Sequence, residues 1–556
     1  MSYIKKFVLP LLVCAGLFLL VNYRHQYNPE FTWRSDLWAD PAGYYVYLPA
    51  LFIYDFDAEK FPEKIDSLCG DGFKINTVKN KLFTKYTCGV AILQAPVFLI
   101  VHALSNSSGS QYEGFAGLYQ KVPAFAAAFY CFLGLLFLFK FLRFYFTTRI
   151  SALTTLCIFF GTNLYFYSVY GNGHSHVYSF ALFSAFLYLT KVITNETKEH
   201  KIIQIISWSF VAALVILIRP LNVIFLIAAA FIDCNSLNSF WLRLQLFLKP
   251  KYIIILLAAT AITFIPQFLY WKYVSGNWIY YSYGNESFLY WKSPQLMKLL
   301  FSPNNGLLPY NPIYLIIVFT LLIMIFKKVK NGLSILVAFC LVVYFSASWH
   351  AVTFGCGYGC RNFAEYTALF TLPMGWVFEK IKTYRFTKFL LSFLIAVCIL
   401  INQKAIFSYD RCFFGEDWEY KEFFQELIRG NYHERVTMKD NGVFTPEKEY
   451  SELIAFAPGK YTLSSFRKAR LTASVNFPDT KTDAAIVMEI KDENDSTIHW
   501  KSVNMKEYIK QPNTFEKITI DFPLPHEYDR NNEFRIYIWN LKKDSFVVEY
   551  LDYDFK

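Results

Sequence analysis

Charged residues are scarce in this sequence. Asp, Glu, Lys and Arg make up only 17% of the 556 residues, whereas 55% are hydrophobic. Soluble domains carry about 25% charged residues, so this composition argues against an ordinary soluble protein and indicates a polytopic membrane protein. The 58 Phe and 40 Tyr are typical of lipid-facing helices and of the aromatic belts at a membrane surface.

Sequence motifs for nucleotides and metals are missing. There is no Walker A loop and no G-x-G-x-x-G after a strand, which argues against a Rossmann-type nucleotide-sugar site and against ATP-driven transport. The 11 cysteines do not form a metal signature, because the Cys356/Cys360 pair in "GCGYGC" has neither a second pair nor a histidine beside it. We therefore expect chemistry without a metal or another cofactor. Cys69/Cys88 and Cys356/Cys360 are two alternatives for a disulfide on an oxidising side of the membrane.

A cleavage site is also missing after the first apolar stretch, "MSYIKKFVLPLLVCAGLFLLV", which we interpret as an uncleaved membrane helix. Eleven runs are long and apolar enough to span: 3–22, 120–142, 150–170, 175–194, 203–218, 220–234, 252–273, 311–326, 333–349, 366–379 and 388–407. A further run, 87–104, is short and interrupted by Gln94 and Pro96.

The basic residues decide the topology. If 87–104 lies on the membrane surface, the clusters at 5–6, 140–149, 191–201, 243–251, 327–330 and 380–388 all fall on one side, as the positive-inside rule requires. The net charge of +11 is then explained largely by topology, and a nucleic-acid partner loses its support. We predict an integral membrane protein with a cytoplasmic N-terminus, in a bacterial inner membrane. The segments 23–119, 274–310 and everything after about 408 then lie outside, on the periplasmic or luminal side.

The last part of the chain has a different pattern. Six segments alternate between apolar and polar residues: "KARLTASVNF", "AAIVMEIKD", "STIHWKSVNM", "FEKITIDF", "FRIYIWNL" and "FVVEYLDYDF". Short strands at this spacing predict an all-β sandwich of the jelly-roll type. Its strand spacing and aromatic residues such as Trp500 and Trp539 resemble those of carbohydrate-binding jelly rolls. The predicted domains are a transmembrane domain (1–407), an amphipathic helical connector (408–432) and the sandwich (433–556).

The stretch "DPAGYYVYLPAL" in the first outer loop has the form of a helix start. Asp40 is able to cap, and Pro41 suits the first helical position because it needs no hydrogen-bond partner there. A helix from this point aligns Tyr44, Tyr47, Leu48 and Leu51 on one face, which we expect to lie in lipid. The Asp40 carboxylate then sits at the membrane surface, facing a cavity between helices. The alternative is that Asp40 is an N-cap and nothing more.

An acid at the start of an interfacial helix, directly after the first membrane helix, resembles the GT-C glycosyltransferases. These include the protein O-mannosyltransferases and the bacterial aminoarabinose transferases, whose first outer loop carries an acidic Asp-x-x-x-Tyr motif, matched here by "DPAGY". "FTKYTCGVAILQAPVFLI" takes the place of their surface helix without its early proline, and "YEGFAGLYQKVPAFAAAF" leads into the next membrane helix. The resemblance covers residues 1–410 as architecture and the first 150 as motif.

The resemblance implies metal-independent, inverting transfer of a sugar from a polyprenyl-phosphate donor to a lipid, glycan or protein acceptor on the outer face. Asp40 is the candidate general base that takes the proton of the acceptor hydroxyl, with Asp36 as the second candidate. The candidate substrate-lining residues are Tyr44, Tyr47, Lys272 and Glu365.

The leaving lipid phosphate needs cations or donors near the outer helix ends. Arg219 in "LIRPLN" sits between two apolar runs, where an unpaired charge is costly, so it is expected either to bind phosphate or to pair within the protein. Arg361 is expected either to bind phosphate or to pair with Glu365 at i+4. His174 and His176 in "GNGHSH" are candidates for a ligand or proton relay, or are solvated residues at a helix start.

Two other functions compete with glycosyl transfer. One is transport or flipping of lipid-linked sugars, although the sequence shows no internal repeat and the candidate charges lie at helix ends rather than mid-span. The other is a non-catalytic membrane protein whose sandwich binds glycan.

Overall fold

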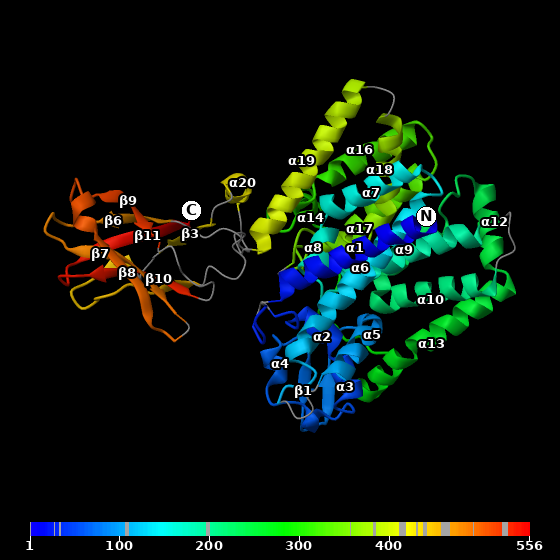
Figure 1. Cartoon of the computed structure of the whole chain (residues 1–556), viewed down its shortest axis with the longest axis horizontal. Coiled ribbons are helices and arrows are strands. Elements are labelled where there is room, and N and C mark those ends of the chain that lie inside the picture. The colour runs from blue at the N-terminus through cyan, green and yellow to red at the C-terminus, as the bar shows by residue number, and fades with distance from the viewer. Residues whose placement is uncertain are drawn as a thin grey trace. The chain divides into compact units, whose positions relative to one another are not determined.

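The computed structural model of the chain (Figure 1) describes residues 2–26, 28–32, 35–105, 111–195, 201–355, 357–381, 385–410, 419–429, 432–437, 442–456, 468–492, 494–524 and 532–555. The chain divides into two compact units, Met1–Ile406 and Phe407–Lys556. The first unit is mainly helical, and the second is built mainly of strands.

The helical unit begins with one long helix, α1 (Ser2–His25), followed by a region of short elements. These are α2 (Asp40–Tyr45), α3 (Tyr47–Phe52), η1 (Ala58–Lys60), α4 (Ile65–Leu68), β1 (Lys74–Asn76), β2 (Lys81–Phe83), α5 (Gly89–Leu104) and η2 (Gly117–Lys121). The elements α2–α4 and β1 lie together at one end of the unit, in blue in Figure 1. Buried aromatic side chains, among them Tyr45, Phe73 and Phe115, give this region a hydrophobic core of its own. It is therefore a folded part of the unit.

Helices of four to 26 residues make up the rest of the unit. They are α6 (Val122–Leu142), α7 (Thr148–Gly161), α8 (Leu164–Val169), α9 (His176–Ile193), α10 (Ile202–Ile218), α11 (Val223–Ala230), α12 (Leu237–Phe247), α13 (Pro250–Ser275), α14 (Leu296–Phe301), α15 (Leu307–Tyr310), α16 (Ile313–Phe326), α17 (Gly332–Ser348), α18 (Thr367–Lys380) and α19 (Arg385–Asp410), with short η3 (Pro220–Asn222) and η4 (Arg361–Phe363) between them. Helices α10 and α13 run side by side in Figure 1.

Four of the described helical stretches are long and apolar enough to cross a membrane: Gly117–Leu142, His176–Ile193, Pro250–Ser275 and Phe386–Tyr409. Seven others are apolar but shorter, among them Gly89–Leu104 and Thr148–Gly161. The predicted run 150–170 is divided into α7 and α8, because Thr162 and Asn163 interrupt the helix between them. The number of eleven spans therefore stays a prediction.

Two of the long helices expose apolar side chains. Only 22% of the apolar window is buried in each of α13 and α19. The exposed residues include Ile254, Leu257 and Ile262 of α13 and Phe386, Phe389 and Phe393 of α19. Apolar faces of this extent are unfavourable in water and indicate contact with lipid.

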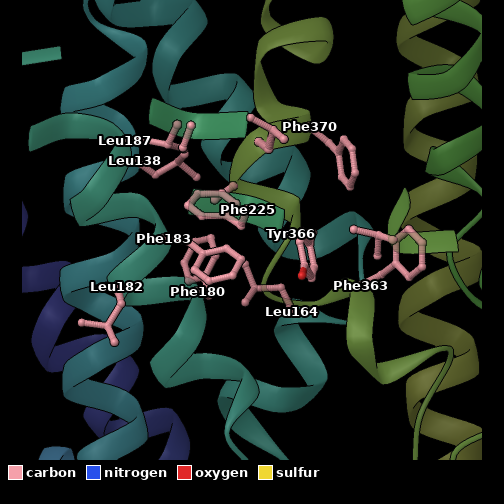
Figure 2. Close-up of a cluster of buried hydrophobic side chains, with 14 of the residues drawn as sticks. Leu138, Leu164, Phe180, Leu182, Phe183, Leu187, Phe225, Phe363, Tyr366 and Phe370 are labelled. Atoms are coloured by element: carbon pink, nitrogen blue, oxygen red, sulfur yellow. The ribbon is translucent and has the colours of Figure 1, made fainter. Parts of the chain in front are cut away.

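The core of the helical unit is rich in aromatic rings. Figure 2 shows Phe180 and Phe183 of α9 close to Phe225 of α11 and to Tyr366. The rings of Phe183 and Phe225 are stacked with centroids 3.6 Å apart, and Tyr366 meets Phe183 edge-on at 5.3 Å. Dense packing of this kind fixes the chain on both sides of residue 365, because Phe363 and Tyr366 are both buried.

The second unit is a two-sheet β-sandwich. After helix α20 (Tyr420–Arg429) come β3 (Tyr432–Thr437), β4 (Val443–Phe444), β5 (Ile454–Phe456), β6 (Lys468–Asn476), β7 (Ala484–Lys491), β8 (Thr497–Asn504), η7 (Met505–Tyr508), β9 (Phe515–Pro523), β10 (Glu533–Asn540) and β11 (Phe546–Phe555). One sheet has the order β5-β10-β7-β8, and the other has the order β3-β11-β6-β9, with β4 paired to β11. All of these pairs are antiparallel. One buried cluster takes side chains from both sheets, as in other sandwiches.

The predicted amphipathic helix at residue 40 is wrong in two respects. Helix α2 ends at Tyr45 and α3 begins at Tyr47, so there are two short helices in place of one. Tyr44, Tyr47 and Leu48 are buried within the protein, and Leu51 is exposed. The expected apolar face in lipid does not exist, because α5 and the other elements between α1 and α6 pack against these two helices.

The cysteine alternatives are also resolved in part. Cys69 and Cys88 are both buried free thiols, so the predicted disulfide between them is wrong. Cys360 is also a buried free thiol, and Cys356 lies outside the described residues.

Candidate functional site

Asp40 is the first residue of α2, but it does not cap that helix. The N-cap position is Ala39, whose φ of 52° and ψ of −121° turn the chain sharply, and no side chain bonds to the free helix N–H groups. Pro41 follows in the first turn, where its missing N–H costs nothing. Because the carboxylate of Asp40 is not used as a cap, it is available for contacts elsewhere, and the N-cap alternative is wrong.

Three side chains from distant segments surround the Asp40 carboxylate. Arg361 Nη1 donates to Asp40 Oδ2 at 3.0 Å, and the Tyr86 hydroxyl donates to Asp40 Oδ1. His174 Nδ1 lies 3.9 Å from Asp40 Oδ2. Burial raises the pKa of Asp40, but Arg361, His174 and the Tyr86 hydroxyl outweigh it and hold the pKa well below its ordinary value. Asp40 is therefore a carboxylate at all physiological pH values.

A second charged pair lies beside the first. Arg219 Nη1 donates to Glu365 Oε1 at 3.2 Å and to Asn362 Oδ1 at 2.9 Å. Glu365 Oε2 is 2.7 Å from His176 Nδ1. Burial raises the pKa of Glu365 to about 7, against the opposing effect of the Arg219 charge. Arg361 pairs with Asp40 and Glu365 pairs with Arg219, so the predicted alternative of an Arg361–Glu365 pair is wrong.

The turn before α9 connects the two pairs. The rings of His174 and His176 have centroids 6.1 Å apart, with one histidine facing Asp40 and the other facing Glu365. Between them, Ser175 Oγ accepts a hydrogen bond from the Tyr44 hydroxyl at 3.3 Å. Burial and the charge of Arg361 lower the pKa of His174 to about 3 against the opposing effect of Asp40, so this imidazole is neutral. The two ion pairs thus form one cluster, which we call the Asp40 cluster: Asp40, Tyr86, His174, His176, Arg219, Arg361, Asn362 and Glu365.

Glycine allows the close approach of this turn to α2. A Cβ atom built at Gly173 lies 2.4 Å from Pro41 Cβ, far inside contact distance. Any side chain here pushes the turn away from α2, and with it His174 from Asp40.

The segment before Arg361 is held in an unusual conformation. Phe354, Gly355, Gly359 and Cys360 all have positive φ values, between 49° and 59°. Asn163 Nδ2 donates to the carbonyl oxygens of Gly359 and Cys360, at 2.7 and 3.2 Å. These buried amide contacts fix the backbone from which Arg361 reaches Asp40. The Arg361 Nε atom is buried and has no hydrogen-bond partner in the described part of the chain.

A cation and an acid from two loops, Lys85 and Glu286, lie at the edge of the cluster. Lys85 Nζ is 2.6 Å from Glu286 Oε1, and both side chains are 33% exposed. The ring of Tyr283 meets the ring of Tyr86 edge-on at 6.4 Å. The Ser282 hydroxyl donates to the Lys85 carbonyl at 2.6 Å, so the 276–295 loop is attached next to the site.

Three of the predicted site residues lie apart from this cluster or only support it. Asp36 is not a helical residue but lies in a bend, where it contacts His25. The Tyr47 hydroxyl donates to the Tyr86 carbonyl, so Tyr47 is buried support and not substrate-lining. Lys272 Nζ donates to the Gly276 carbonyl, and the ammonium lies over the Trp278 ring.

Two members of the cluster, Tyr86 and Asn362, and the neighbouring Lys85 were not found from the sequence. Tyr86, Lys85 and Asn362 follow no local pattern, because their partners are far away in the chain. The sequence offers one local indication of a role for Lys85 and Tyr86. These two polar residues directly precede the apolar run 87–104, on the side predicted to be outer. No group of three or more His, Cys, Asp or Glu suited to a metal ion occurs among the described residues.

A scan against protein-family models finds no match, and a search of the curated proteins finds none either. Among solved structures, the Archaeoglobus fulgidus oligosaccharyltransferase in its apo form is similar at 15% identity and a TM-score of 0.40, over 77% of this chain and 57% of that chain. The chain thus spans 57% of the length of that enzyme. ArnT from Cupriavidus metallidurans, bound to undecaprenyl phosphate, is similar at 13% identity and a TM-score of 0.40, over 76% of each chain. Similarity this low leaves the function to be argued from the site.

Proposed function

We propose that this protein is a membrane glycosyltransferase that moves a sugar from a polyprenyl-phosphate donor to an acceptor at the outer face of the membrane. One observation carries the proposal: an ionised carboxylate and two guanidinium groups, from segments far apart in the sequence, converge with their ends partly exposed. Asp40, Arg219 and Arg361 have side chains that are 28%, 25% and 19% exposed. This set supplies a base and a phosphate-binding pair in one place.

Asp40 is the general base in this proposal. An acceptor hydroxyl that attacks the anomeric carbon loses its proton to the carboxylate, while the bond from that carbon to the phosphate oxygen breaks and the configuration inverts. The low pKa makes Asp40 a weak base, so positioning by Arg361 and Tyr86 supplies much of the effect. Glu365 has a better-matched pKa, but its side chain is fully buried and cannot reach a substrate.

Arg219 and Arg361 bind the donor phosphate. A guanidinium has five N–H donors in a planar fork that suits phosphate oxygens. The exposed part of the Arg361 side chain is the part that a phosphate oxygen is able to reach, since Nε is buried. Glu365, buried behind Arg219, holds that guanidinium in place. His174, being neutral, adds a hydrogen-bonding group without adding charge.

The surroundings suit a lipid-linked donor. The exposed apolar faces of α13 and α19 indicate contact with lipid, in which a polyprenyl chain dissolves. The proposal includes the predicted topology, with the Asp40 cluster on the periplasmic or luminal side and the N-terminus in the cytoplasm.

The test is a transfer assay with the full-length protein in membranes that contain a radiolabelled pool of polyprenyl-phosphate sugars. We expect wild type to label a membrane acceptor and Asp40→Asn to lower the rate by about 10²–10⁴-fold, the range for a lost general base. Asp55→Asn is the matched control. Asp55 is an exposed carboxylate of the same outer region, paired with Lys60, and its positive φ of 53° suits asparagine.

Three outcomes of this assay contradict the proposal or its interpretation. A normal rate in Asp40→Asn removes Asp40 as the base. Absence of transfer by wild type, with lipid-linked sugar crossing the bilayer instead, favours a transporter. An equal loss in Asp55→Asn assigns the effect to the folding of the outer region and not to chemistry.

A further inference from the structure

The outward face of the four-stranded sheet carries a group of aromatic side chains. In β10, Phe534, Ile536 and Ile538 point into the sandwich core, so the alternating residues Arg535, Tyr537 and Trp539 point outward. On β8, Trp500 lies opposite Glu489 of β7, which is also on the outward side. Trp500 is 47% exposed, a high value for the largest side chain in a folded sheet.

Trp500 and Tyr537 reach toward each other across the sheet. Trp500 Nε1 donates to the Tyr537 hydroxyl at 3.3 Å. Because β7 lies between β8 and β10, this hydrogen bond crosses over β7. Val487 of β7 points outward between these strands and is nevertheless fully buried, since the rings cover it. The result is a connected group of rings, which we call the platform, and not a row of separate protruding side chains.

Tyr450 extends the platform and is held firmly. Its ring stacks on Trp539 at 6.1 Å with an interplanar angle of 19°, and it meets Tyr537 edge-on at 5.9 Å. Two hydrogen bonds attach the next residue to β10: Ser451 N donates to the Ile538 carbonyl, and Ile538 N donates to Ser451 Oγ, both at 2.9 Å. Tyr450 is 48% exposed, so its ring is both fixed and accessible.

The charged groups at one end of the platform neutralise one another. Arg535 pairs with Glu533 and, at 2.7 Å, with Asp495. Lys491 lies 3.3 Å from Asp495 and 3.9 Å from Glu489. Two cations against three carboxylates give no positive field, so the face is unsuited to an anionic membrane or a polyanion.

We propose that this platform, made of Tyr450, Trp500, Tyr537 and Trp539, binds a neutral oligosaccharide. The C–H-rich face of a sugar ring packs on a flat aromatic ring, and rigid Tyr and Trp side chains lose little conformational entropy in doing so. Arg535 and Glu489 at one end of the rings supply a donor and an acceptor for sugar hydroxyls. The inference is independent of the Asp40 cluster and of the proposed transfer reaction.

The experiment measures binding of the full-length protein, in lipid nanodiscs, to immobilised neutral hexasaccharides of glucose, mannose, xylose and N-acetylglucosamine. We expect wild type to bind at least one of them, and Trp500→Ala and Tyr450→Ala each to weaken that binding by about tenfold, as for loss of a stacking ring. Phe515→Ala is the matched control, because Phe515 is 53% exposed on β9 of the other sheet. Thermal unfolding of each variant confirms that the sandwich is folded.

Three outcomes overturn the proposal. The first is no binding of wild type to any of the hexasaccharides at millimolar concentration. The second is binding that Phe515→Ala weakens as much as Trp500→Ala does. The third is a wild-type protein that does not bind the sugars but binds phosphatidylglycerol vesicles, with that binding lost in Trp500→Ala and Tyr450→Ala. This outcome makes the platform a membrane contact.

Discussion

Asp36 and Asp40 are four residues apart, and the protein uses them in opposite ways. The Asp36 side chain is 3% exposed, whereas that of Asp40 is 28% exposed. Asp36 Oδ1 lies 2.6 Å from both His25 Nδ1 and Asn28 Nδ2, two partners close to it in the sequence. Asp40 takes its partners from residues 86, 174 and 361.

The difference shows how burial separates a carboxylate enclosed within the protein from one that keeps an open side. Asp36 connects the end of α1 to neighbouring segments, since His25 Nε2 also lies 2.6 Å from the Val169 carbonyl. Lys121 Nζ lies 3.8 Å from the second oxygen of Asp36. Asp40 has equally strong partners but keeps an open side, which a substrate needs. Charge and neighbouring cations alone do not distinguish the two residues.

The largest effect is expected for a change that keeps the charge of Asp40 and moves it. Asp40→Glu lengthens the side chain by one methylene, and a misplacement of about 1 Å is enough to lower the transfer rate by about 10²-fold. The measurement is the rate per folded molecule in the assay described above. If Asp40→Glu transfers sugar at a rate close to wild type, the exact position of the carboxylate is unimportant. The difference between Asp36 and Asp40 is then a difference in burial alone.

A smaller effect is expected when Arg361 loses its planar fork. Arg361→Lys keeps the positive charge beside Asp40 but removes Nε and the bidentate geometry, so donor affinity is expected to fall by about tenfold. The measurement is the donor KM. Arg243→Lys is the control, because Arg243 donates to the Ala230 carbonyl away from the Asp40 cluster. An unchanged KM in Arg361→Lys contradicts phosphate binding by this residue.

For Asp36 the expected effect is on stability and not on rate. Burial raises the pKa of Asp36, but His25, Lys121 and Asn28 outweigh it and lower the pKa below its ordinary value. Its ionised form therefore stabilises the fold above pH ~4, and this stabilisation is lost as the pH falls further. Asp36→Asn is expected to cost ~1–3 kcal/mol at neutral pH, measured by thermal unfolding. A loss of rate per folded molecule as large as that of Asp40→Asn means that Asp36 takes part in the chemistry.

The smallest effect concerns pH. Asp40 stays ionised and His174 stays neutral between pH 6 and 8, whereas Glu365, with a pKa of about 7, gains charge as the pH rises. The raised pKa of Glu365 means that this residue stabilises the fold most below its unfolded pKa of about 4.3, and that this contribution is lost as the pH rises through 7.

Charged Glu365 also competes with the donor phosphate for Arg219, so donor affinity is expected to fall by about threefold from pH 6 to 8. Glu365→Gln is expected to remove this dependence; its persistence in the variant assigns the titration to another group.

Much of the fold follows from local patterns in the sequence. The six alternating segments after residue 467 correspond to β6–β11, because half-buried strands must alternate. Strands β3, β4 and β5 were not predicted. The last two have three residues or fewer, which is too short for alternation to stand out. The lipid-facing helix at residue 40 was predicted wrongly because period alone does not tell whether an apolar face meets lipid or protein.

The site was only partly predictable for a related reason. Asp40 could be found, since an acid before a helix-starting proline is a local signal. Of the two alternatives for Arg361, the pair with Glu365 is wrong because i,i+4 spacing implies a contact only in an α-helix, and η4 with the turn after it is not one. The actual contacts of Asp40 with Tyr86 and Arg361 depend on tertiary packing. No pattern of neighbouring residues encodes them.

The separation of the two partners in the Asp40–Arg361 contact also has a consequence during synthesis. They are 321 residues apart, so the ribosome completes most of the helical unit before the carboxylate meets its guanidinium. A nascent chain that has released residues 23–119 still lacks the Asp40–Arg361 contact. The polypeptide therefore gains its charged centre late, once α17 and the segment that carries Arg361 are in place. A chain truncated before residue 361 lacks the guanidinium that pairs with Asp40.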